Sequence, residues 1–572
     1  MPNLRFTLFR TWLAKPESLL ILVLLGMVTG VATGLVMTGF LLLLNGLLAL
    51  LNGDSLEDFE SLSHPLRFAL PLLGSLALIG LYRWTPARTH NVGIAHVIDR
   101  LQRGRGRLAA GNIFFQLIAA LIALGSGHSV GKEGPAVHIG AGIANQLGQR
   151  THRVPSQLRL LIGCGTAAAI SAAFDTPLAG VLFAMEVVLM EYSLLGFTPI
   201  IAAAVTASAT SRWLIGEHPS FIAIELHSAQ FSDWPLLIVT GLVIGLIAVA
   251  FHHLVRAAQR YCPSPRPIRL LLAGLMTGTL ALAVPEILGS GFDTVNQTLT
   301  APQTWQVLAL ILVAKLIATA CAVGLGIPAG VIGPIMVIGA CGGALMASVL
   351  PGASSVALYA LLGMAGMMSA VLHAPLAALA AVLELSLSAQ AMFPAMIVVL
   401  SANLVCQHGF RLPSLFRGIL ESQGLSIQTH PVRTALAQRY LSELGTRQFD
   451  SCDPTTESDR IAALAKSPYR WVVLQIDSKA YLIAKDKLAE CHQDWVQLDA
   501  NVRPPFVEAV QSLIGPYSRL HPLADDITLL EAVKSLQHED TAGFLLPLDD
   551  GKPGLVTRAQ LVSVLTSEGD IQ

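Results

Sequence analysis

The sequence is poor in charged residues. Asp, Glu, Lys and Arg make up only 13% of its 572 residues, whereas 53% are hydrophobic and the mean hydropathy is +0.62. Soluble domains carry about 25% charged residues, so we expect lipid to solvate most of this chain. The formal net charge is −1. This balance excludes the general positive field by which proteins attract nucleic acid.

Paired cysteines and long unbroken apolar runs are also scarce. The seven cysteines are scattered without a Cys-x-x-Cys pair, so the sequence predicts no metal site, no disulfide framework and no cofactor. Several apolar blocks fall short of the roughly 20 residues that a full membrane span needs. Short blocks interrupted by Gly and Pro, in matching places of two halves, indicate broken helices around a site at mid-membrane depth.

A glycine-rich stretch occurs twice in the chain. Residues 125–141 and 324–340 agree at eight positions at an offset of 199, including both Gly-Pro pairs. A second pair of blocks, 165–186 and 363–384, matches at an offset of 198, and each of them ends in a glutamate. Two aligned pairs at nearly one offset predict two homologous membrane halves.

This duplication and the change in composition beyond residue 413 divide the chain into six parts. The expected parts are an N-terminal cytoplasmic segment 1–18, membrane half one 19–214, a connecting segment 215–235, membrane half two 236–412, a linker 413–445 and a soluble domain 446–572. Short apolar runs in the last part indicate mixed strands and helices, including a helix at 529–536 and a strand-turn-strand unit over 544–558.

Each glycine-rich copy predicts a loop that enters a helix with proline in its first turn. The start of a helix carries a partial positive charge and unpaired N–H donors, so it attracts anions. Glu133 lies at the first of these starts, and Ile332 takes its place in the second copy. Only one copy therefore brings its own carboxylate.

Three other functions compete with an anion pathway. A phosphate-binding loop at Gly131-Lys132 is disfavoured because Ser126 and Glu133 stand where that motif needs a glycine and a hydroxyl residue. Metal or acid-base chemistry by Glu133 with His128 and His138 is disfavoured by their spacing. A membrane sensor that transports nothing remains open, but we expect no enzyme.

The anion pathway uses the same residues without these conflicts. Two helix starts that meet at mid-depth supply N–H donors without a full positive charge, so an anion is held yet can leave. Glu133 would occupy the anion site when ionised and vacate it when protonated, which makes it a gate. Glu186 and Glu384 end apolar runs, and we expect both to be structural, either satisfied by hydrogen bonds or facing water, and not to carry protons.

At these residues the sequence resembles a known family. Gly131-Lys132-Glu133-Gly134-Pro135 is similar to the Gly-Lys/Arg-Glu-Gly-Pro motif of the CLC chloride channels and proton/chloride exchangers. Residues 330–334 resemble their Gly-x-Phe-x-Pro motif, with Ile332 in place of Phe. The resemblance implies an all-α polytopic membrane protein with an inverted-repeat fold, broken helices and a small α/β cytoplasmic domain.

The resemblance also implies roles for single residues. Glu133 would be the gating and proton-accepting glutamate, and the N–H groups of Val331 and Ile332 would coordinate the central anion. The other members of the first motif that we place at the anion site are Gly131, Lys132 and Gly134. The expected partners are chloride or a similar small anion, protons in the exchanger case, the lipid bilayer and a second copy of the chain.

Three positions depart from the family pattern. The family's anion-binding serine becomes Val92, and its pore tyrosine best matches Phe416. Without these two hydroxyl donors, each worth about 0.5–1.5 kcal/mol, we predict a weaker and less selective central site. The inner proton glutamate of many exchangers becomes Val187. This valine favours a passive channel slightly over a proton-coupled antiporter.

The soluble part resembles a degenerate pair of CBS modules, whose matching ends are 481–488 and 554–561. The Thr/Ser-x-x-Asp pattern that binds adenosine becomes Thr557 with Gln560 and Ala484 with Lys487. We therefore expect a structural or dimer-stabilising role and no nucleotide. The arginine-rich loop 83–107 predicts a cytoplasmic side, so we expect a cell-membrane protein with its C-terminal domain in the cytoplasm.

Overall fold

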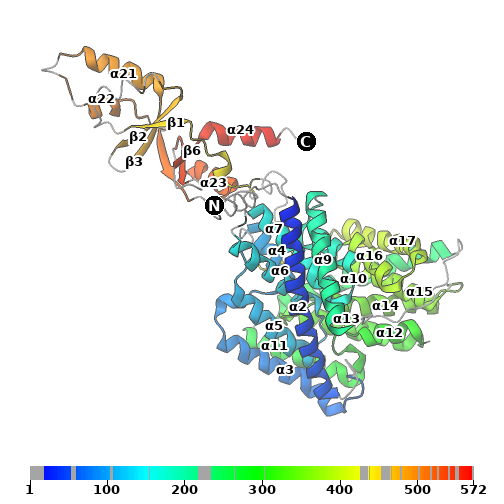
Figure 1. Ribbon diagram of the computed structural model, residues 1–572. Coiled ribbons are helices and arrows are strands. Elements are labelled where there is room, and N and C mark those ends of the chain that lie inside the picture. Colours follow the sequence, from blue (N-terminus) through cyan, green and yellow to red (C-terminus); the bar gives the residue numbers. More distant parts are fainter. Residues whose placement is uncertain are drawn as a thin grey trace, which may run out of the picture. The chain divides into compact units, whose positions relative to one another are not determined.

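The computed structural model divides the chain into two compact units, residues 1–427 and 428–572, which we describe separately (Figure 1). The first is described at 19–52, 59–103, 107–151, 153, 155–192, 194–216, 233–262, 265–301, 303–353 and 355–425. The second is described over 436–569 except 437–438, 453–463, 465–466, 477–478, 500–502, 505, 516–517, 525–526, 539–540 and 548–552. The expected segment 1–18 and most of 215–235 lie outside these ranges.

The first unit is built from helices. In the first half they are α2 (Leu19–Asn52), α3 (His64–Trp84), α4 (Gly93–Arg103), α5 (Ala110–Gly125), α6 (Glu133–Arg150), α7 (Pro155–Phe174), α8 (Pro177–Phe183) with η2 (Ala184–Leu189), and α9 (Leu194–Ile215). In the second they are α10 (Trp234–Tyr261), α11 (Arg266–Ala283), α12 (Phe292–Thr300), α13 (Trp305–Leu325), α14 (Ile332–Val349), α15 (Val356–Leu372), α16 (Pro375–Ser386), α17 (Met392–Asn403) with η6 (Leu404–Gly409), and α18 (Leu415–Ser422).

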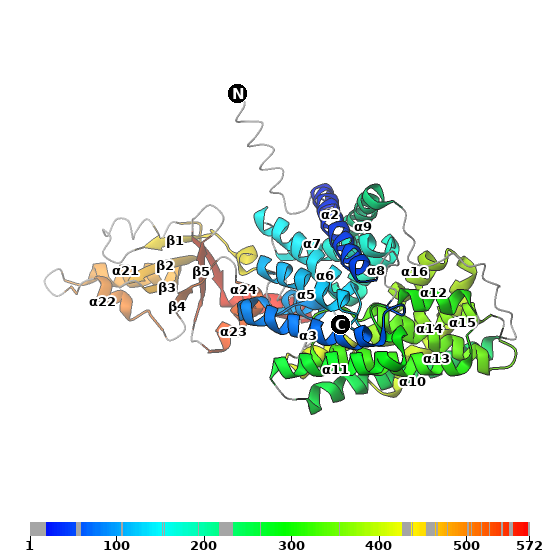
Figure 2. The same ribbon diagram turned by 90° about the horizontal axis from the view of Figure 1, so that it is seen from below.

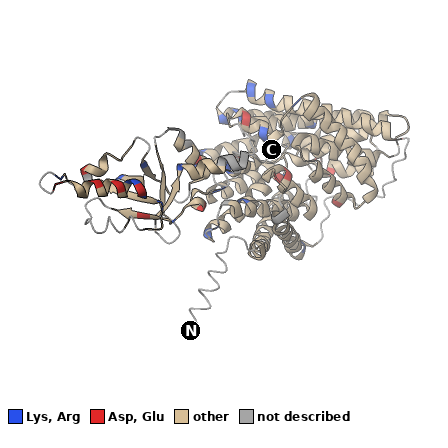
Figure 3. Ribbon diagram, turned by 90° about the horizontal axis from the view of Figure 1, so that it is seen from above, with Lys and Arg blue, Asp and Glu red and all other residues tan. Residues whose placement is uncertain are grey.

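Eight helices among the described residues are long and apolar enough to cross a membrane. Large apolar side chains remain exposed on their outer faces, for example Leu42 at 55% and Leu310 at 55%. Figure 3 shows that the helices of this unit carry few charges. An apolar exterior of this extent needs lipid around it, so the chain is an integral membrane protein, as its composition predicted.

The two halves repeat the same packing. In half one α2 packs against α9 and α6 against α7, whereas in half two α10 packs against α17 and α14 against α15 (Figure 2). The α6–α7 pair and the α14–α15 pair both cross at glycines. A Cβ on Gly140 would lie 2.2 Å from the Gly165 carbonyl oxygen, and one on Gly339 would lie 2.4 Å from that of Gly363. Small residues permit this approach in lipid.

Helices α8 and α16 cap each other across the two halves. Glu186, just beyond α8, accepts hydrogen bonds from the N–H groups of Leu376 (3.1 Å) and Ala377 (2.8 Å) at the start of α16. Glu384 near the end of α16 accepts from Leu178 and Ala179, both at 2.8 Å, at the start of α8. The helices are therefore antiparallel, as an inverted repeat requires, and both glutamates are satisfied by hydrogen bonds as expected.

The second unit contains a six-stranded sheet in the order β1-β2-β3-β4-β5-β6. Its strands are β1 (Phe449–Cys452), β2 (Trp471–Ile476), β3 (Lys479–Ala484), β4 (Arg519–Pro522), β5 (Gly543–Pro547) and β6 (Pro553–Thr557), and its helices include α21 (Lys485–Gln497), α22 (Phe506–Gln511), α23 (Leu529–His538) and α24 (Arg558–Gly569). The expected helix at 529–536 and the antiparallel β5–β6 pair are confirmed.

The sheet contains two similar halves. β1 and β4 each pair in parallel with the next strand, which pairs antiparallel with the strand after it. The segments 481–488 and 554–561 both run from a strand into a helix, β3 into α21 and β6 into α24. They thus occupy equivalent places, and their identity as CBS modules stays a prediction.

The expected linker 413–445 is wrong at both ends. Leu415, Phe416 and Leu420 of α18 are buried in the core of the helical unit, whereas Leu436 and Leu441 are buried in the core of the sheet unit. The sequence did not reveal this because α18 has only eight residues, in which apolar pairs are separated by Arg417-Gly418 and followed by Glu421-Ser422. The part between these anchors, 426–435, lies outside the described residues.

Candidate functional site

The two glycine-rich loops meet inside the helical unit. Gly131 N–H donates to the Gly330 carbonyl at 2.8 Å, and Gly330 N–H donates to the Gly131 carbonyl at 2.6 Å, so the loops form an antiparallel bridge. We call this contact the junction. Helix α6 begins two residues beyond Gly131, and α14 begins two residues beyond Gly330. The duplication therefore brings two helix starts together, as expected.

Glu133 is buried at the junction, with 1% of its surface exposed. Its Oε1 accepts a hydrogen bond from Gly333 N–H at 3.0 Å, in the first turn of α14. A buried carboxylate is costly unless polar donors surround it, and the positive end of a helix supplies such donors. The Glu133 carboxylate therefore occupies an N–H group that could otherwise hold a free anion.

A cavity of about 320 Å³, which we call the junction cavity, borders this contact. Val92 and Gly93 at the start of α4, Gly134 of α6, Val331 at the start of α14 and Phe416 of α18 all line it. The starts of three helices, α4, α6 and α14, thus face one space. Val331 and Ile332 open α14, and the N–H groups of a first turn have no partner inside the helix. Such groups can hold an anion in this cavity.

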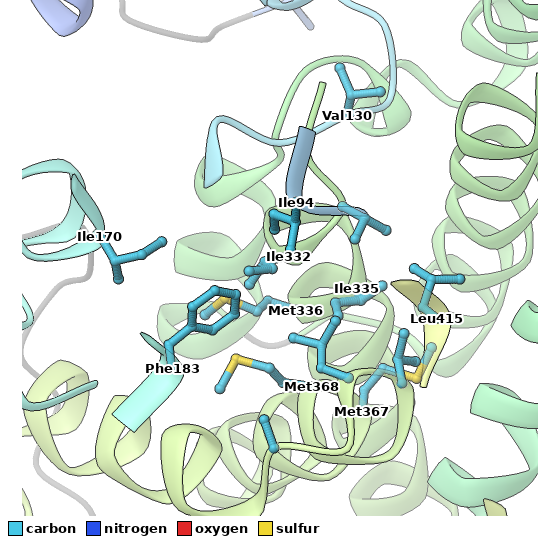
Figure 4. Close-up of a cluster of buried hydrophobic side chains, with 14 of the residues drawn as sticks. Ile94, Val130, Ile170, Phe183, Ile332, Ile335, Met336, Met367, Met368 and Leu415 are labelled. Carbon is cyan, nitrogen blue, oxygen red and sulfur yellow. The ribbon is translucent and has the colours of Figure 1, made fainter. Parts of the chain in front are cut away.

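A second cavity of about 50 Å³, the apolar cavity, lies on another side of Glu133. Ile332, Phe183, Met336 and Met368 line it together with Glu133. Figure 4 shows these four apolar side chains gathered around one space. Because its lining is almost entirely apolar, it offers little to hold ordered water. Ile332 therefore contributes its side chain to this cavity, apart from any role of its N–H.

Two residues expected at the anion site make other contacts. The N–H of Gly131 donates to Gly330 and so holds the junction together, and a role of Gly131 toward an anion stays a prediction. The Lys132 ammonium lies 4.9 Å from the ring centre of Phe174 and 5.1 Å from that of Phe292. Cation–π contacts of this kind hold Lys132 between two rings. Its role toward an anion stays a prediction.

Val187 lies in η2 and is 3% exposed. It lines a third cavity of about 550 Å³, which we call the Val187 cavity and which Glu186 also lines. The position expected for an inner proton glutamate therefore borders a polar space. Its own side chain cannot bind a proton.

The histidines near Glu133 serve other contacts. His128 Nε2 lies 3.3 Å from Ser75 Oγ, and His138 Nδ1 accepts from Gly93 N–H at 3.4 Å. His138 also packs against His96, with ring centres 5.5 Å apart. Among the described residues, no group of three or more His, Cys, Asp or Glu side chains could hold a metal ion.

Sequence reasoning missed two buried polar residues near the junction. Lys315 is fully buried, and its ammonium donates to the carbonyls of Ile287 and Gly289, at 2.9 and 3.0 Å. Gln116 is also fully buried and donates to the Pro328 carbonyl at 2.8 Å. A lysine inside an apolar run is itself a functional signal in a membrane protein, and that signal could have identified Lys315.

Restoring the missing hydroxyls should tighten the central anion site. We expect Val92→Ser and Phe416→Tyr each to raise chloride affinity about two- to tenfold, because each adds one neutral hydrogen-bond donor. Calorimetric titration of chloride into the purified protein measures this. Val92→Ala is the matched control and should leave affinity nearly unchanged. Equal affinities in all the variants would remove Val92 and Phe416 from the site.

Comparison with known proteins supports a common function for this arrangement. Residues 73–407 match the family model described as voltage gated chloride channel. The chain is 33% identical over 359 residues to a putative chloride channel protein ClcB-like of Ralstonia nicotianae, which covers 60% of this chain and 82% of that protein. It is 31% identical over 414 residues to the voltage-gated ClC-type chloride channel ClcB of Escherichia coli O17:K52:H18, covering 69% and 97%.

Solved structures agree with this assignment. A slow cyanobacterial Cl⁻/H⁺ antiporter has a TM-score of 0.63 at 20% identity, covering 72% of this chain and 99% of that one, and shows the same fold. A CLC-type fluoride/proton antiporter has a TM-score of 0.60 at 26% identity, covering 70% and 98%. With the duplicated junction and its buried glutamate, these findings show that the chain belongs to the voltage-gated chloride channel family, CLC, and performs CLC-type chloride transport.

Proposed function

We propose that this protein conducts chloride passively, with Glu133 as the gate, and that it is not an enzyme. The observation that supports Glu133 as the gate is the hydrogen bond from Gly333 N–H to Glu133 Oε1. An ionised carboxylate competes with chloride for the start of α14. Protonation removes its charge, weakens its hold on the amide and leaves that place to an anion.

The passive mode is supported by what surrounds the gate. A proton that crosses the protein must reach Glu133 from the other side, and a titratable side chain or a chain of waters must carry it. Val187 has no titratable group, and the apolar cavity beside Glu133 is lined by Phe183, Met336 and Met368. Both features disfavour proton transfer along this route.

The second candidate is a proton-coupled antiporter. Glu186 and His373 line the Val187 cavity, so titratable groups do lie close to Val187. The similar fluoride/proton antiporter also makes fluoride an anion to test. The third candidate, a membrane sensor without transport, predicts no flux at all.

Flux under opposed gradients separates these candidates. We expect liposomes that contain the full chain to lose a chloride gradient, and a proton gradient to drive no uphill chloride movement. A chloride electrode and a pH electrode measure both fluxes, and fluoride replaces chloride in a parallel series. Uphill chloride pumping would establish the antiporter instead. If the liposomes lost their chloride gradient no faster than protein-free liposomes do, the membrane sensor would be favoured.

We further propose a homodimer in the cell membrane with the sheet unit in the cytoplasm. The sheet unit then has a structural role without a nucleotide. This is supported by Gln560, whose Oε1 accepts from Thr557 N–H at 2.8 Å and from Thr557 Oγ1 at 3.0 Å. The side chain that stands in place of a ribose-binding carboxylate is thus engaged in capping α24.

A further inference from the structure

The Val187 cavity has no role in chloride conduction as proposed above. At about 550 Å³ it is larger than the junction cavity, and it falls in the 300–1,000 Å³ range of small-molecule sites. Three segments line it: the end of η2, the turn between α15 and α16 at His373, and the segment from η6 into α18. All of them belong to the helical unit.

Two arginines bring guanidinium groups to this cavity. Arg411 is exposed, and within the described residues it makes no ion pair and no hydrogen bond through its side chain. Arg417, on α18, donates from Nε to Glu421 at 3.0 Å, and its other guanidinium nitrogens face no second carboxylate among the described ion pairs. The cavity therefore keeps guanidinium donors available for an anionic guest.

Two further kinds of donor face the same space. His373 lines the cavity. Ser414, the N-cap of α18, also lines it, and its side chain makes no capping bond. The first-turn N–H groups of α18 therefore need an acceptor from elsewhere. An imidazole and a helix start thus add to the guanidinium groups.

The two carboxylates in the cavity already have partners. Glu186 accepts from two N–H groups at the start of α16 and from Tyr192 Oη at 2.7 Å. Glu421 is paired with Arg417. Neither makes an ion pair with Arg411 among the described residues, so the Arg411 guanidinium keeps its donors free, although the formal charges of the two arginines and two glutamates of the lining cancel.

We propose that the Val187 cavity binds a phosphate group. Guanidinium groups match the geometry of a phosphate and bind it through paired, charge-assisted hydrogen bonds, and a helix start adds N–H donors to the same anion. The volume exceeds that of inorganic phosphate and accommodates a mononucleotide or a phosphorylated lipid headgroup. Those two sources share the phosphomonoester chemistry that Arg411, Arg417 and His373 recognise.

The site has a direct structural link to the anion pathway. Ser414, Arg417 and Glu421 lie on one face of α18 and line the Val187 cavity. Phe416 and Leu420 lie on a different face and line the junction cavity. A phosphate group that fixes one face of this short helix therefore fixes the position of Phe416.

Binding is measured on the full-length protein independently of transport. In detergent, inorganic phosphate and adenosine monophosphate are titrated by calorimetry. In nanodiscs, the melting temperature is compared between phosphatidic acid, a phosphomonoester, and phosphatidylglycerol, a diester. We expect Arg411→Gln to weaken binding at least about tenfold, because it removes charge-assisted hydrogen bonds. Arg103→Gln makes the same change in charge on α4 and should bind as the wild type does.

Two further variants are chosen so that the substitution does not strain the backbone. Arg411 has φ +50° and His373 has φ +58°, in the left-handed region that glycine and asparagine tolerate best. Arg411→Gly and His373→Asn therefore remove the cation and the imidazole without backbone strain. Binding of the soluble probes identifies a free phosphate compound, and stabilisation by phosphatidic acid alone identifies a lipid. No binding of any probe, or equal binding by wild type, Arg411→Gln and Arg411→Gly, would overturn the proposal.

Discussion

Glu133→Gln is expected to make chloride flux independent of pH. In the wild type, flux should rise as pH falls, because protonation frees the start of α14 from the carboxylate. Above the pKa of a carboxyl group, its protonated fraction falls about tenfold for each pH unit. The chloride flux of the wild type should therefore change about tenfold or more with pH. Gln is uncharged at every pH and should give the acid level of flux throughout. Flux from liposomes measured at several pH values tests this.

A second, half-buried glutamate of the helical unit provides the control. Glu384 also lies in the helical unit and accepts two N–H groups, at the start of α8, but it does not line the cavities at the junction. We expect Glu384→Gln to keep the pH dependence of the wild type. If Glu133→Gln retained the same dependence, Glu133 would not be the gate.

Gly330→Ala is expected to abolish flux and to lower thermal stability. A Cβ at this position would lie 2.5 Å from Gly134 N and 2.7 Å from the Gly131 carbonyl oxygen. Both are backbone atoms, so the two loops must separate and lose their mutual hydrogen bonds. Overpacking of this kind costs about 1–3 kcal/mol. Liposome flux and the melting temperature of the purified protein measure the two effects.

The matched control is Gly39→Ala in α2. No heavy atom would lie within 4 Å of a Cβ there, and Ala is about 1 kcal/mol better than Gly inside a helix. This variant should keep full flux and at least the wild-type stability. Normal flux in Gly330→Ala would show that the junction does not need its close backbone contact.

The sequence predicts the general plan of the site because the plan follows from the duplication. Two loops at an offset of 199 predict two similar helix starts, and the structure joins them through Gly131 and Gly330. The likeness of the loops does not say which N–H group serves which acceptor. The Gly131 N–H donates to Gly330, whereas the Gly333 N–H donates to Glu133. These assignments depend on the angle at which the loops meet.

Contacts between segments distant in sequence account for the other differences. The N–H groups that donate to Glu186 and Glu384 lie about 190 to 206 residues away in the chain. The sequence alone therefore does not identify these donors. Lys315 is held by carbonyls of a separate loop. Helix α18 was assigned to the linker because eight residues are too few to span a membrane, yet Phe416 packs into the helical core.

The most direct test of the account is the position of a bound anion at the junction. Bromide replaces chloride in crystals of the purified protein, and its anomalous scattering marks the site. We predict a peak within hydrogen-bond distance of the Val331 and Ile332 N–H groups, and in Glu133→Gln a further peak at Gly333 N–H. A bromide peak elsewhere, with none at the start of α14 in either protein, would contradict the claim that the two joined helix starts hold the transported anion.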